Sequence, residues 1–297
     1  MNGEYSVCIS FSEIIFKFVF PEKIELPHEF EEFLCENTDR YDEKITVSLL
    51  DSPLLCNERS LTDGNTKVYA KKDGLLYVYS ELTAKDGCRV AFFCADNREN
   101  ILYYPSSMWS FFSSPFNCLH LICGERLLLR NGAFLLHSSV VKYKEKCFLF
   151  CGPSGIGKST QAALWQKYCG ATVINGDRCI IRKINGKFHG GGSFWCGTSG
   201  IYHKDYLPIE GVFFLDKSKE NIVEKLGAEA FALILSNTTV NSYDKSFMEK
   251  IVDIIEDLFN SVPICKLRCR PDESAVETVL NAVYGREEKE DGRLRFR

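Results

Sequence analysis

The sequence predicts an α/β protein in which a small β-rich N-terminal domain precedes a larger domain built on a mixed β-sheet. Three observations lead to this fold class. The first hundred residues alternate apolar and polar positions between turn-rich segments, as half-buried β-strands do. Residues 147–169 read as a strand, a glycine-rich loop and a helix in direct succession. Short apolar segments joined by tight polar turns indicate antiparallel hairpins beside that loop.

The N-terminal domain is expected to span residues 1–115. Its alternating segments are residues 7–11, 75–79 and 90–94. Phe16, Phe18 and Phe20 form a stripe on one face of a further strand. Such a stripe either lines a substrate groove or belongs to the core, and the core is the commoner case. No catalytic pattern is visible in this domain.

The second domain is expected to span residues 116–285. Before the glycine-rich loop the pattern predicts one helix and three strand segments, at residues 117–129, 133–137, 138–143 and 147–151. The last two segments flank the turn Lys144-Glu-Lys146, so the strand that feeds the loop has an antiparallel partner. A second hairpin turns at Asn185-Gly186. Hairpins of this kind predict a mixed sheet instead of a purely parallel one.

The C-terminal part of the second domain is predicted to be helical. Residues 244–259 place apolar side chains, including Ile254 and Leu258, at helical spacing. Residues 273–284 follow an Asp272 cap and stop at Gly285. The charged residues 286–297 are expected to form a disordered tail.

Composition excludes several classes of protein. The 297 residues are 45% hydrophobic and 26% charged, as in an ordinary globular protein. A net charge of -4 gives no electrostatic reason to expect nucleic acid as a partner. No apolar run is long enough to cross a membrane, and the amino terminus does not resemble an export signal. We therefore expect a cytoplasmic protein. The fourteen cysteines contain no C-x-x-C pair, so we expect reduced core thiols and not a metal site.

The glycine-rich loop carries the strongest functional signal. Residues 152–160 follow the pattern G-x-x-x-x-G-K-[ST], in which glycines let consecutive N–H groups turn toward phosphate oxygens. Lys158 can reach the outer phosphates, and the Ser159 hydroxyl is placed to bind Mg²⁺. The predicted nucleotide-binding residues are Gly152, Ser154, Gly155, Ile156, Gly157, Lys158, Ser159 and Thr160. The alternative is a glycine-rich turn that merely connects a strand to a helix.

Two acidic residues follow the loop and predict different enzymes. Asp177 ends the short strand of Val173-Ile-Asn-Gly-Asp, where a carboxylate can accept a proton from an attacking hydroxyl or bind Mg²⁺. Asp216 ends Val212-Phe-Phe-Leu-Asp, which reads like the metal-binding strand of common nucleotide hydrolases. Either aspartate could also simply begin a turn, so the local pattern does not separate them.

Several motifs together resemble the HPr kinase family, specifically its HPr-kinase-like branch. The motifs are at residues 136–140, 152–160, 175–178, 192–195 and 267–273. That branch is similar in its core to ATP-dependent phosphoenolpyruvate carboxykinase, in which the phosphate loop sits in a mixed sheet. The resemblance covers about residues 116–285 and only weakly the N-terminal part.

The resemblance implies a set of roles. ATP and Mg²⁺ would be the cofactors, held by the loop with Ser159 and Asp177 as metal ligands. Asp177 would be base or metal ligand, and His137 would approach the phosphates, although a strand-end histidine by itself is more often structural. Trp195 would lie near the acceptor pocket, and Asp216 would be a turn residue after a core strand.

The sequence departs from the family at two places. The family usually has two adjacent aspartates where this chain has Gly176-Asp177, so one acid covers both tasks or Asp205 or Glu210 substitutes. The segment of the type E-x-R-G-x-G that follows the acidic motif in members acting on HPr is not found, so HPr is a poor candidate substrate.

The sequence therefore predicts a kinase that transfers the γ-phosphoryl group of ATP to a hydroxyl. A serine of a protein or precursor peptide is the expected acceptor, and the resemblance makes a precursor of a modified peptide conceivable. Three alternatives stay open: a small-molecule kinase acting on free serine or a similar compound, a non-catalytic ATP-binding module that controls a peptide-binding surface, and a nucleotide hydrolase that uses Asp216. The sequence also leaves a homo-oligomer open.

Overall fold

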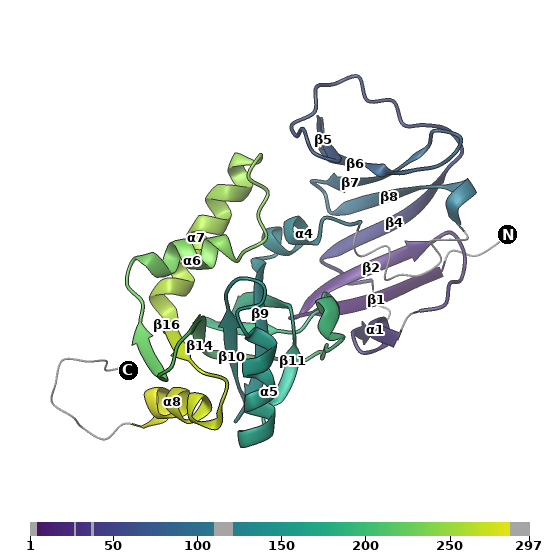
Figure 1. Cartoon of the computed structure of the whole chain (residues 1–297). Coiled ribbons are helices and arrows are strands. Elements are labelled where there is room, and N and C mark those ends of the chain that lie inside the picture. The colour runs from purple at the N-terminus through teal and green to yellow at the C-terminus, as the bar shows by residue number, and fades with distance from the viewer. Residues whose placement is uncertain (1–4, 27, 37–38, 110–120, 286–297) are drawn as a thin grey trace. The chain divides into compact units, whose positions relative to one another are not determined.

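The chain folds into two compact units, Met1–Asn131 and Gly132–Arg297. The computed structural model describes residues 5–26, 28–36, 39–109 and 121–285 (Figure 1). Each unit is built on one eight-stranded sheet that mixes parallel and antiparallel pairs. The predicted α/β class with mixed sheets is therefore confirmed. The predicted boundary at residues 115 and 116 and the predicted tail at residues 286–297 lie outside the described residues.

The first unit consists mainly of strands. In chain order it contains β1 (Tyr5–Phe11), β2 (Ile14–Phe20), α1 (His28–Glu31), β3 (Leu34–Cys35), β4 (Glu43–Leu50), β5 (Thr66–Lys71), β6 (Gly74–Thr83), β7 (Arg89–Ala95), β8 (Glu99–Pro105), the 3-10 turn η1 (Ser106–Met108) and α4 (Gly124–Arg130). The strand order is β3-β1-β2-β4-β8-β7-β6-β5, and the pairs β2–β4 and β4–β8 are parallel. Phe16, Phe18 and Phe20 are fully buried, so the aromatic stripe belongs to the core.

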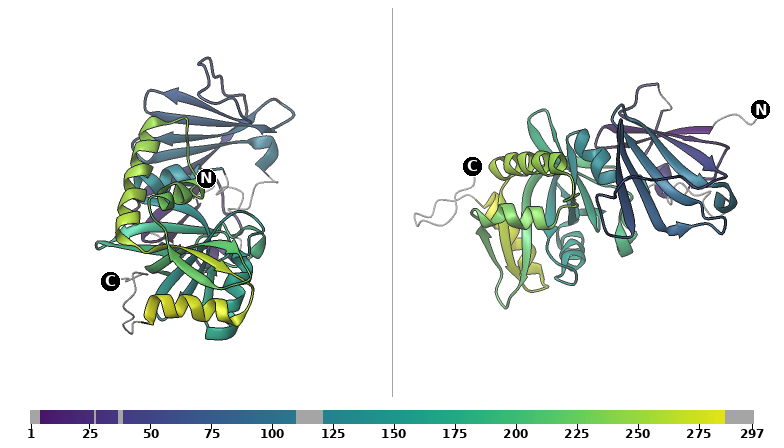
Figure 2. Two further views of the ribbon diagram at one scale, coloured as in Figure 1. Left: turned by 60° about the vertical axis from the view of Figure 1, so that its left-hand side comes forward. Right: turned by 90° about the horizontal axis from the view of Figure 1, so that it is seen from above.

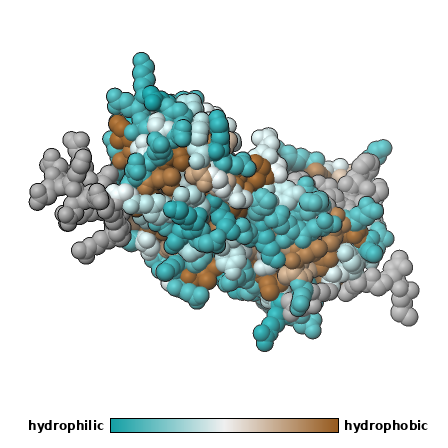
Figure 3. Space-filling model, turned by 90° about the horizontal axis from the view of Figure 1, so that it is seen from below, coloured by the Kyte–Doolittle hydropathy of each residue, from teal (hydrophilic) through white to brown (hydrophobic). Residues whose placement is uncertain are grey.

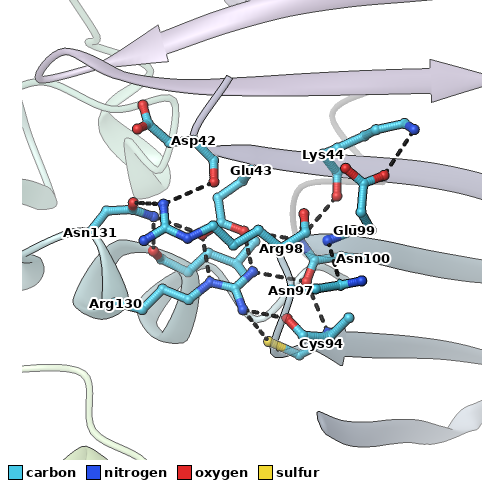
Figure 4. A network of polar contacts seen from close by, with 12 residues as sticks. Asp42, Glu43, Lys44, Cys94, Asn97, Arg98, Glu99, Asn100, Arg130 and Asn131 are labelled. Atoms are coloured by element: carbon cyan, nitrogen blue, oxygen red, sulfur yellow. Dashed lines mark hydrogen bonds and ion pairs between the residues drawn. The ribbon is translucent and has the colours of Figure 1, made fainter. Parts of the chain in front are cut away.

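A buried polar network ties α4 to the sheet of the first unit (Figure 4). The carboxylate of Glu43 is fully buried and forms an ion pair with Arg130 at the end of α4. Asn100 and Asn131 donate side-chain amides to the same carboxylate, over 3.0 and 2.7 Å. Arg98 donates to Asn131 Oδ1 over 2.8 Å. Because a buried carboxylate needs several donors, this network holds the helix at one place on the sheet.

The helix α4 is shorter than the sequence predicts. The pattern predicts a helix over residues 117–129, of which residues 117–120 lie outside the described part of the chain. Leu121 and Ile122 are buried but not helical, and Cys123 takes the left-handed conformation with φ 49° and ψ 52°. An L-residue in that conformation does not continue a right-handed helix, so α4 begins only at Gly124.

The second unit combines strands with four helices of the described chain. It contains β9 (Ala133–Tyr143), β10 (Lys146–Cys151), α5 (Lys158–Cys169), β11 (Thr172–Asn175), β12 (Arg178–Ile184), β13 (Lys187–Gly191), the 3-10 turn η2 (Gly197–Ser199), β14 (Tyr206–Lys217), β15 (Ile222–Lys225), α6 (Glu229–Ser236), α7 (Lys245–Ser261), β16 (Ile264–Cys269) and α8 (Glu273–Tyr284). The strand order is β10-β9-β12-β13-β14-β16-β15, with β11 paired to β9. A parallel pairing of β10 with β14 closes the first five of these strands into a ring.

The ring can close because its long strands pair with different neighbours along their length. The two segments predicted at residues 133–137 and 138–143 are one strand, β9, whose first half pairs with β12 and whose second half pairs with β10. Both predicted hairpins are confirmed. The turn between β9 and β10 places Lys144 and Glu145 at φ 48° and 56°, and the turn between β12 and β13 places Asn185 and Gly186 at φ 50° and 78°. Positive φ at both central residues is the geometry that two-residue hairpins prefer.

The helices α5 and α8 lie side by side on one face of the second sheet (Figure 2). Trp165 on α5 is fully buried against the rings of Phe148 and Phe150 on β10, and Val276 and Val279 of α8 join the same core. This packing anchors the helix that follows the glycine-rich loop. The helices predicted at residues 244–259 and 273–284 are confirmed as α7 and α8.

Two details of the helix predictions are wrong. On α7, Phe247, Ile251 and Leu258 are buried as their spacing predicts, but Ile255 and not Ile254 completes the buried stripe. Asp272 occupies the N-cap position of α8 without capping it, because its carboxylate accepts from Asn221 Nδ2 over 3.0 Å and from Ser274 Oγ over 2.7 Å.

Most cysteines of the described residues are buried and behave as core thiols. Every cysteine of the described residues is a free thiol, and burial raises the pKa of Cys147 to about 12. A thiol with such a pKa stays neutral and packs as a small apolar group.

The described helices include none that is both long and apolar enough to cross a membrane. On the face drawn in Figure 3, hydrophobic residues come to the surface in small groups separated by hydrophilic ones. Single apolar residues and small groups of this kind are normal on protein surfaces.

Candidate nucleotide site

The glycine-rich loop connects the end of β10 to the start of α5. Gly152, Gly155 and Gly157 have φ values of 138°, 76° and 121°, which residues with a side chain rarely adopt. A Cβ atom at Gly155 or Gly157 would meet nothing within 4 Å, so the space over the loop is open. The loop therefore has an open backbone, in conformations that suit glycine, that a phosphate group can approach closely.

The side chain of Lys158, at the C-terminal end of the glycine-rich loop, reaches back to the residues at its start. Its ammonium group donates to the carbonyl oxygens of Gly152 over 2.9 Å and Pro153 over 3.3 Å. The residue is only 8% exposed, and this burial lowers the pKa of Lys158, while the negative charge of Asp177 opposes the shift. Asp177 is thus close enough to act on the lysine electrostatically.

The remaining loop residues present donors to the same open space. Ser154, Ser159 and Thr160 are exposed, whereas Ile156 packs against the core beneath the loop. The first N–H groups of α5 have no partner within the helix, and the positive end of its dipole lies there. Lys158, the free amides and the open glycines fit a chain of nucleotide phosphates. The structure thus brings all the predicted nucleotide-binding residues together at one loop.

Asp177 and His137 face each other where β9 passes from its pairing with β12 to its pairing with β10. His137 on β9 pairs in register with Arg178, the first residue of β12. His137 Nδ1 lies 3.1 Å from Asp177 Oδ1, and both side chains are 28% exposed. The contact has the length of an ion pair, although the two groups do not align as a regular hydrogen bond. The imidazole of His137 lowers the pKa of Asp177 below its usual value, partial burial opposes this, and the nearby charge of Arg178 lowers it further.

The main chain around Asp177 is fixed by Asn175. Its buried side-chain oxygen accepts from the N–H groups of Asp177 and Arg178, each over 2.8 Å. Its side-chain nitrogen donates to the carbonyl of Ser193 over 2.6 Å. The carbonyl of Asp177 itself accepts from the N–H of Ser138 over 3.0 Å. Such a turn holds the carboxylate without relying on a second acidic neighbour.

The structure explains why Gly176 carries no second carboxylate. A Cβ atom at Gly176 would lie 2.2 Å from Oγ and 2.5 Å from Cβ of Ser199, which belongs to η2. A Cβ atom at Gly197, at the start of the same turn, would lie 2.9 Å from Cγ of Asp177. The turn η2 therefore packs directly on residues 176 and 177, and no side chain fits between them.

The two proposed substitutes for the missing acid are in the wrong place. Asp205 lies 3.5 Å from Lys142 and Glu210 lies 3.7 Å from Lys146. Lys146 begins β10 and Lys142 pairs beside it, whereas the glycine-rich loop follows the other end of that strand. Asp205 and Glu210 are held at the opposite end of β10, so neither carboxylate supplements Asp177.

Asp216 is not the turn residue after a core strand that the family resemblance implies. It belongs to a strand and lies near the start of the glycine-rich loop. It is inside β14, which runs parallel to β10, and its residue is exposed. The carbonyl of the preceding Leu215 is 3.7 Å from the Cβ position of Gly152. Asp216 thus stands beside the start of the loop, where a hydrolase would need it, and the expected turn is not found there.

The site offers few protein ligands for Mg²⁺. The described residues contain no group of three or more His, Cys, Asp or Glu side chains that could hold a metal ion. The exposed Ser159 hydroxyl and the Asp177 carboxylate offer oxygen atoms, which are the ligands that Mg²⁺ prefers. Because Mg²⁺ in nucleotide sites usually keeps several waters and binds phosphate oxygens as well, two protein ligands suit it.

Known proteins give little further guidance. No family model matches the chain, and no curated protein matches it. The chain is similar in structure to the Hpr(Ser) kinase/phosphatase from Coxiella burnetii, over 51% of this chain and 93% of that one, with 12% identity and a TM-score of 0.31. The likeness is to a kinase and is weak, so a functional assignment has to rest on the residues of the site.

Sequence reasoning missed several members of the site. Arg178 belongs to the motif at residues 175–178, but the sequence predicts no role for it. No pattern in the sequence indicates Thr239, because it follows α6, far along the chain from the loop. The Asn175-Gly-Asp pattern could have indicated the side-chain turn that orients Asp177. Trp195 is partly buried, with its ring 4.3 Å from that of Phe194, and the structure assigns it no further role.

Proposed function

We propose that the protein is an ATP- and Mg²⁺-dependent kinase that transfers the γ-phosphoryl group to a hydroxyl, with a serine of a protein or peptide as the acceptor. The observation that supports this most is the place of Asp177 beside the glycine-rich loop: its carbonyl accepts from the N–H of Ser138, and Ser138 pairs with Cys151, the residue before Gly152. A carboxylate that can act on the acceptor hydroxyl is thus held near the loop whose lysine can act on the phosphates. Phosphoryl transfer needs both, and it needs little other chemistry from the protein.

The residues would act mainly by position and charge. Lys158 and the amides of the loop would hold the outer phosphate oxygens, and bound Mg²⁺ would add positive charge there. The acceptor oxygen would form its bond to the γ-phosphorus in line with the breaking bond to the bridging oxygen of ADP, and the hydroxyl proton would pass to the carboxylate of Asp177. Because the pKa of Asp177 is lowered, its carboxylate is ionised at neutral pH and can orient the hydroxyl. A weak base suffices if the transition state is loose.

Binding and turnover test the proposal separately. Calorimetry with MgATP should show binding to the wild-type protein, and Lys158→Ala should weaken it strongly. Labelled ATP with a panel of serine-containing peptides, and with free serine, should then give a labelled acceptor. Asp177→Asn should lower transfer by about 100-fold or more while MgATP still binds. Lys146→Ala, which removes a lysine at the other end of β10, is the matched control.

Two competing functions predict other results. The steric exclusion of a second acid at Gly176 favours a non-catalytic ATP-binding module, which would bind MgATP tightly without labelling any acceptor. The position of Asp216 beside Gly152 favours a hydrolase, which would release phosphate from ATP without an acceptor and lose this activity on Asp216→Asn. A wild-type protein that takes up no nucleoside triphosphate would contradict all three functions.

A further inference from the structure

Arg178 is held beside Asp177 at two points of its guanidinium group. Its Nε lies 3.4 Å from Oδ2 of Asp177, on the side away from the oxygen that faces His137. One terminal nitrogen donates to the hydroxyl of Thr239 over 2.6 Å. The main chain of Arg178 is also fixed, because its N–H donates to Asn175 Oδ1 and its carbonyl accepts from Ser193 Oγ over 3.0 Å.

The anchor on Thr239 is itself rigid. The N–H of Thr239 donates to the carbonyl of Leu135 over 3.1 Å, and the carbonyl of Asn237 accepts from the N–H of His137 over 2.8 Å. Residues 237–239 are thereby pinned along the first half of β9. Because a threonine hydroxyl is uncharged, this anchor orients the guanidinium group without neutralising it.

Arg178 keeps unused capacity for an anion. A guanidinium group has five N–H donors, and the contacts with Asp177 and Thr239 occupy only part of them. The side chain is 36% exposed. Arg178 also lies near the start of the loop, because the carbonyl of the adjacent Asp177 accepts from the N–H of Ser138, which pairs with Cys151, the residue before Gly152. Arg178 and Lys158 therefore bring two cationic side chains to the region of the single carboxylate of Asp177, and a further anion would balance them.

We propose that Arg178 is a catalytic residue that binds the oxygen atoms of the phosphoryl group during its transfer. This inference rests on the proposed kinase function. The planar fork of arginine matches two phosphate oxygens at once, which a lysine cannot do. A fixed positive charge at the place where negative charge spreads in the transition state is among the strongest catalytic devices. Together, Arg178 and Lys158 would act on the group that leaves ADP, while Asp177 acts on the acceptor hydroxyl.

The test needs no knowledge of the acceptor. Calorimetry compares the binding of MgADP with that of MgADP plus fluoroaluminate, which imitates the phosphoryl group in transfer. The wild-type protein should bind the second mixture at least 10-fold more tightly. Arg178→Ala should bind MgADP with an affinity within about 2-fold of wild type. It should lose most of the gain in affinity that fluoroaluminate causes, because Arg178 contacts the transferring group and not ADP. Arg178→Lys should keep a small part of it.

Matched variants separate binding from folding. Arg182→Ala removes an arginine from the same strand, four residues further from the site, and should leave the gain unchanged. Thr239→Val removes only the hydroxyl that anchors Arg178 and should reduce the gain by an intermediate factor. Thermal unfolding checks that each variant is folded. If the wild-type protein does not bind MgADP, the nucleotide site itself is wrong. If it binds MgADP but gains nothing from fluoroaluminate, or if Arg178→Ala keeps the full gain, the role of Arg178 is overturned while the nucleotide site stands.

Discussion

Replacing Gly176 with alanine should destabilise the second unit. The new Cβ atom would lie 2.2 Å from Oγ and 2.5 Å from Cβ of Ser199. The hydroxyl could rotate away, but the Cβ atom is fixed to the backbone of η2, so the turn itself has to move. Ser199 Oγ also donates to the carbonyl of Cys196 over 2.5 Å, and that hydrogen bond would be strained or lost.

The size of the effect follows from these two contributions. Overpacking of this kind costs about 1–3 kcal/mol. Loss of the hydrogen bond adds about 0.5–1.5 kcal/mol. A total of roughly 1.5–4.5 kcal/mol lowers the melting temperature of a domain of this size by roughly 3–18 °C. Gly176→Asp should be at least as unfavourable, so adding the second acid should not simply produce a better enzyme.

A double-mutant cycle measured by urea unfolding checks the reasoning. Ser199→Gly removes both atoms that the new side chain would meet, so Gly176→Ala should cost much less in that background than in the wild type. Gly64→Ala is the control, because a Cβ atom there meets nothing within 4 Å. If Gly176→Ala costs less than about 0.5 kcal/mol in the wild-type background, the packing of η2 on Gly176 is wrong.

Three further perturbations have expected outcomes. Arg130→Leu leaves the buried carboxylate of Glu43 without its cation and should lower the free energy of unfolding in urea by about 3–5 kcal/mol. The double substitution Glu43→Gln with Arg130→Met should restore most of this loss, and a loss below about 1 kcal/mol for Arg130→Leu would contradict the network. Asp244→Ala removes the acceptor of the Phe247 N–H at the start of α7 and should cost about 1 kcal/mol, whereas no change would mean that the cap is not formed. The pKa of Asp177 is lowered in the folded protein, so its ionised form stabilises the fold above the unfolded pKa of about 3.9, and this contribution is lost as the pH falls through the folded value. The stability difference between wild type and Asp177→Asn should therefore shrink from pH 7 to pH 3, and a constant difference would argue against this shift.

The sequence pattern predicts the tight turns and the helices whose formation depends mainly on neighbouring residues. The turns at Lys144-Glu145 and Asn185-Gly186 lie between short apolar runs, and both became hairpins because two-residue loops favour positive φ at such positions. The apolar spacing of α7 and the glycine stop of α8 likewise fixed both helices within a few residues. Cys123 gave no comparable signal, because a left-handed cysteine depends on its surroundings and not on its own preference.

The candidate site was predictable only where it is contiguous in sequence. The loop from Gly152 to Ser159 is a single segment, so its pattern could be read directly. The place of Thr239 beside Arg178 depends on how residues 237–239 pair with β9, and nothing in the local sequence encodes that. The exclusion of a side chain at Gly176 depends on η2, which approaches from more than twenty residues away in the chain. Tertiary packing decides such features, and single-sequence reasoning does not see it.

The closure of the ring by β10 and β14 has a consequence for synthesis of the chain. One edge of β10 can pair at once with β9 in a local hairpin, whereas its other edge waits until residues 209–214 have left the ribosome. An apolar strand edge that stays uncovered can pair with other chains. Nascent or truncated chains that end before β14 should therefore aggregate, and they should not capture nucleotide, because the backbone that supports the start of the loop at Gly152 has not yet arrived.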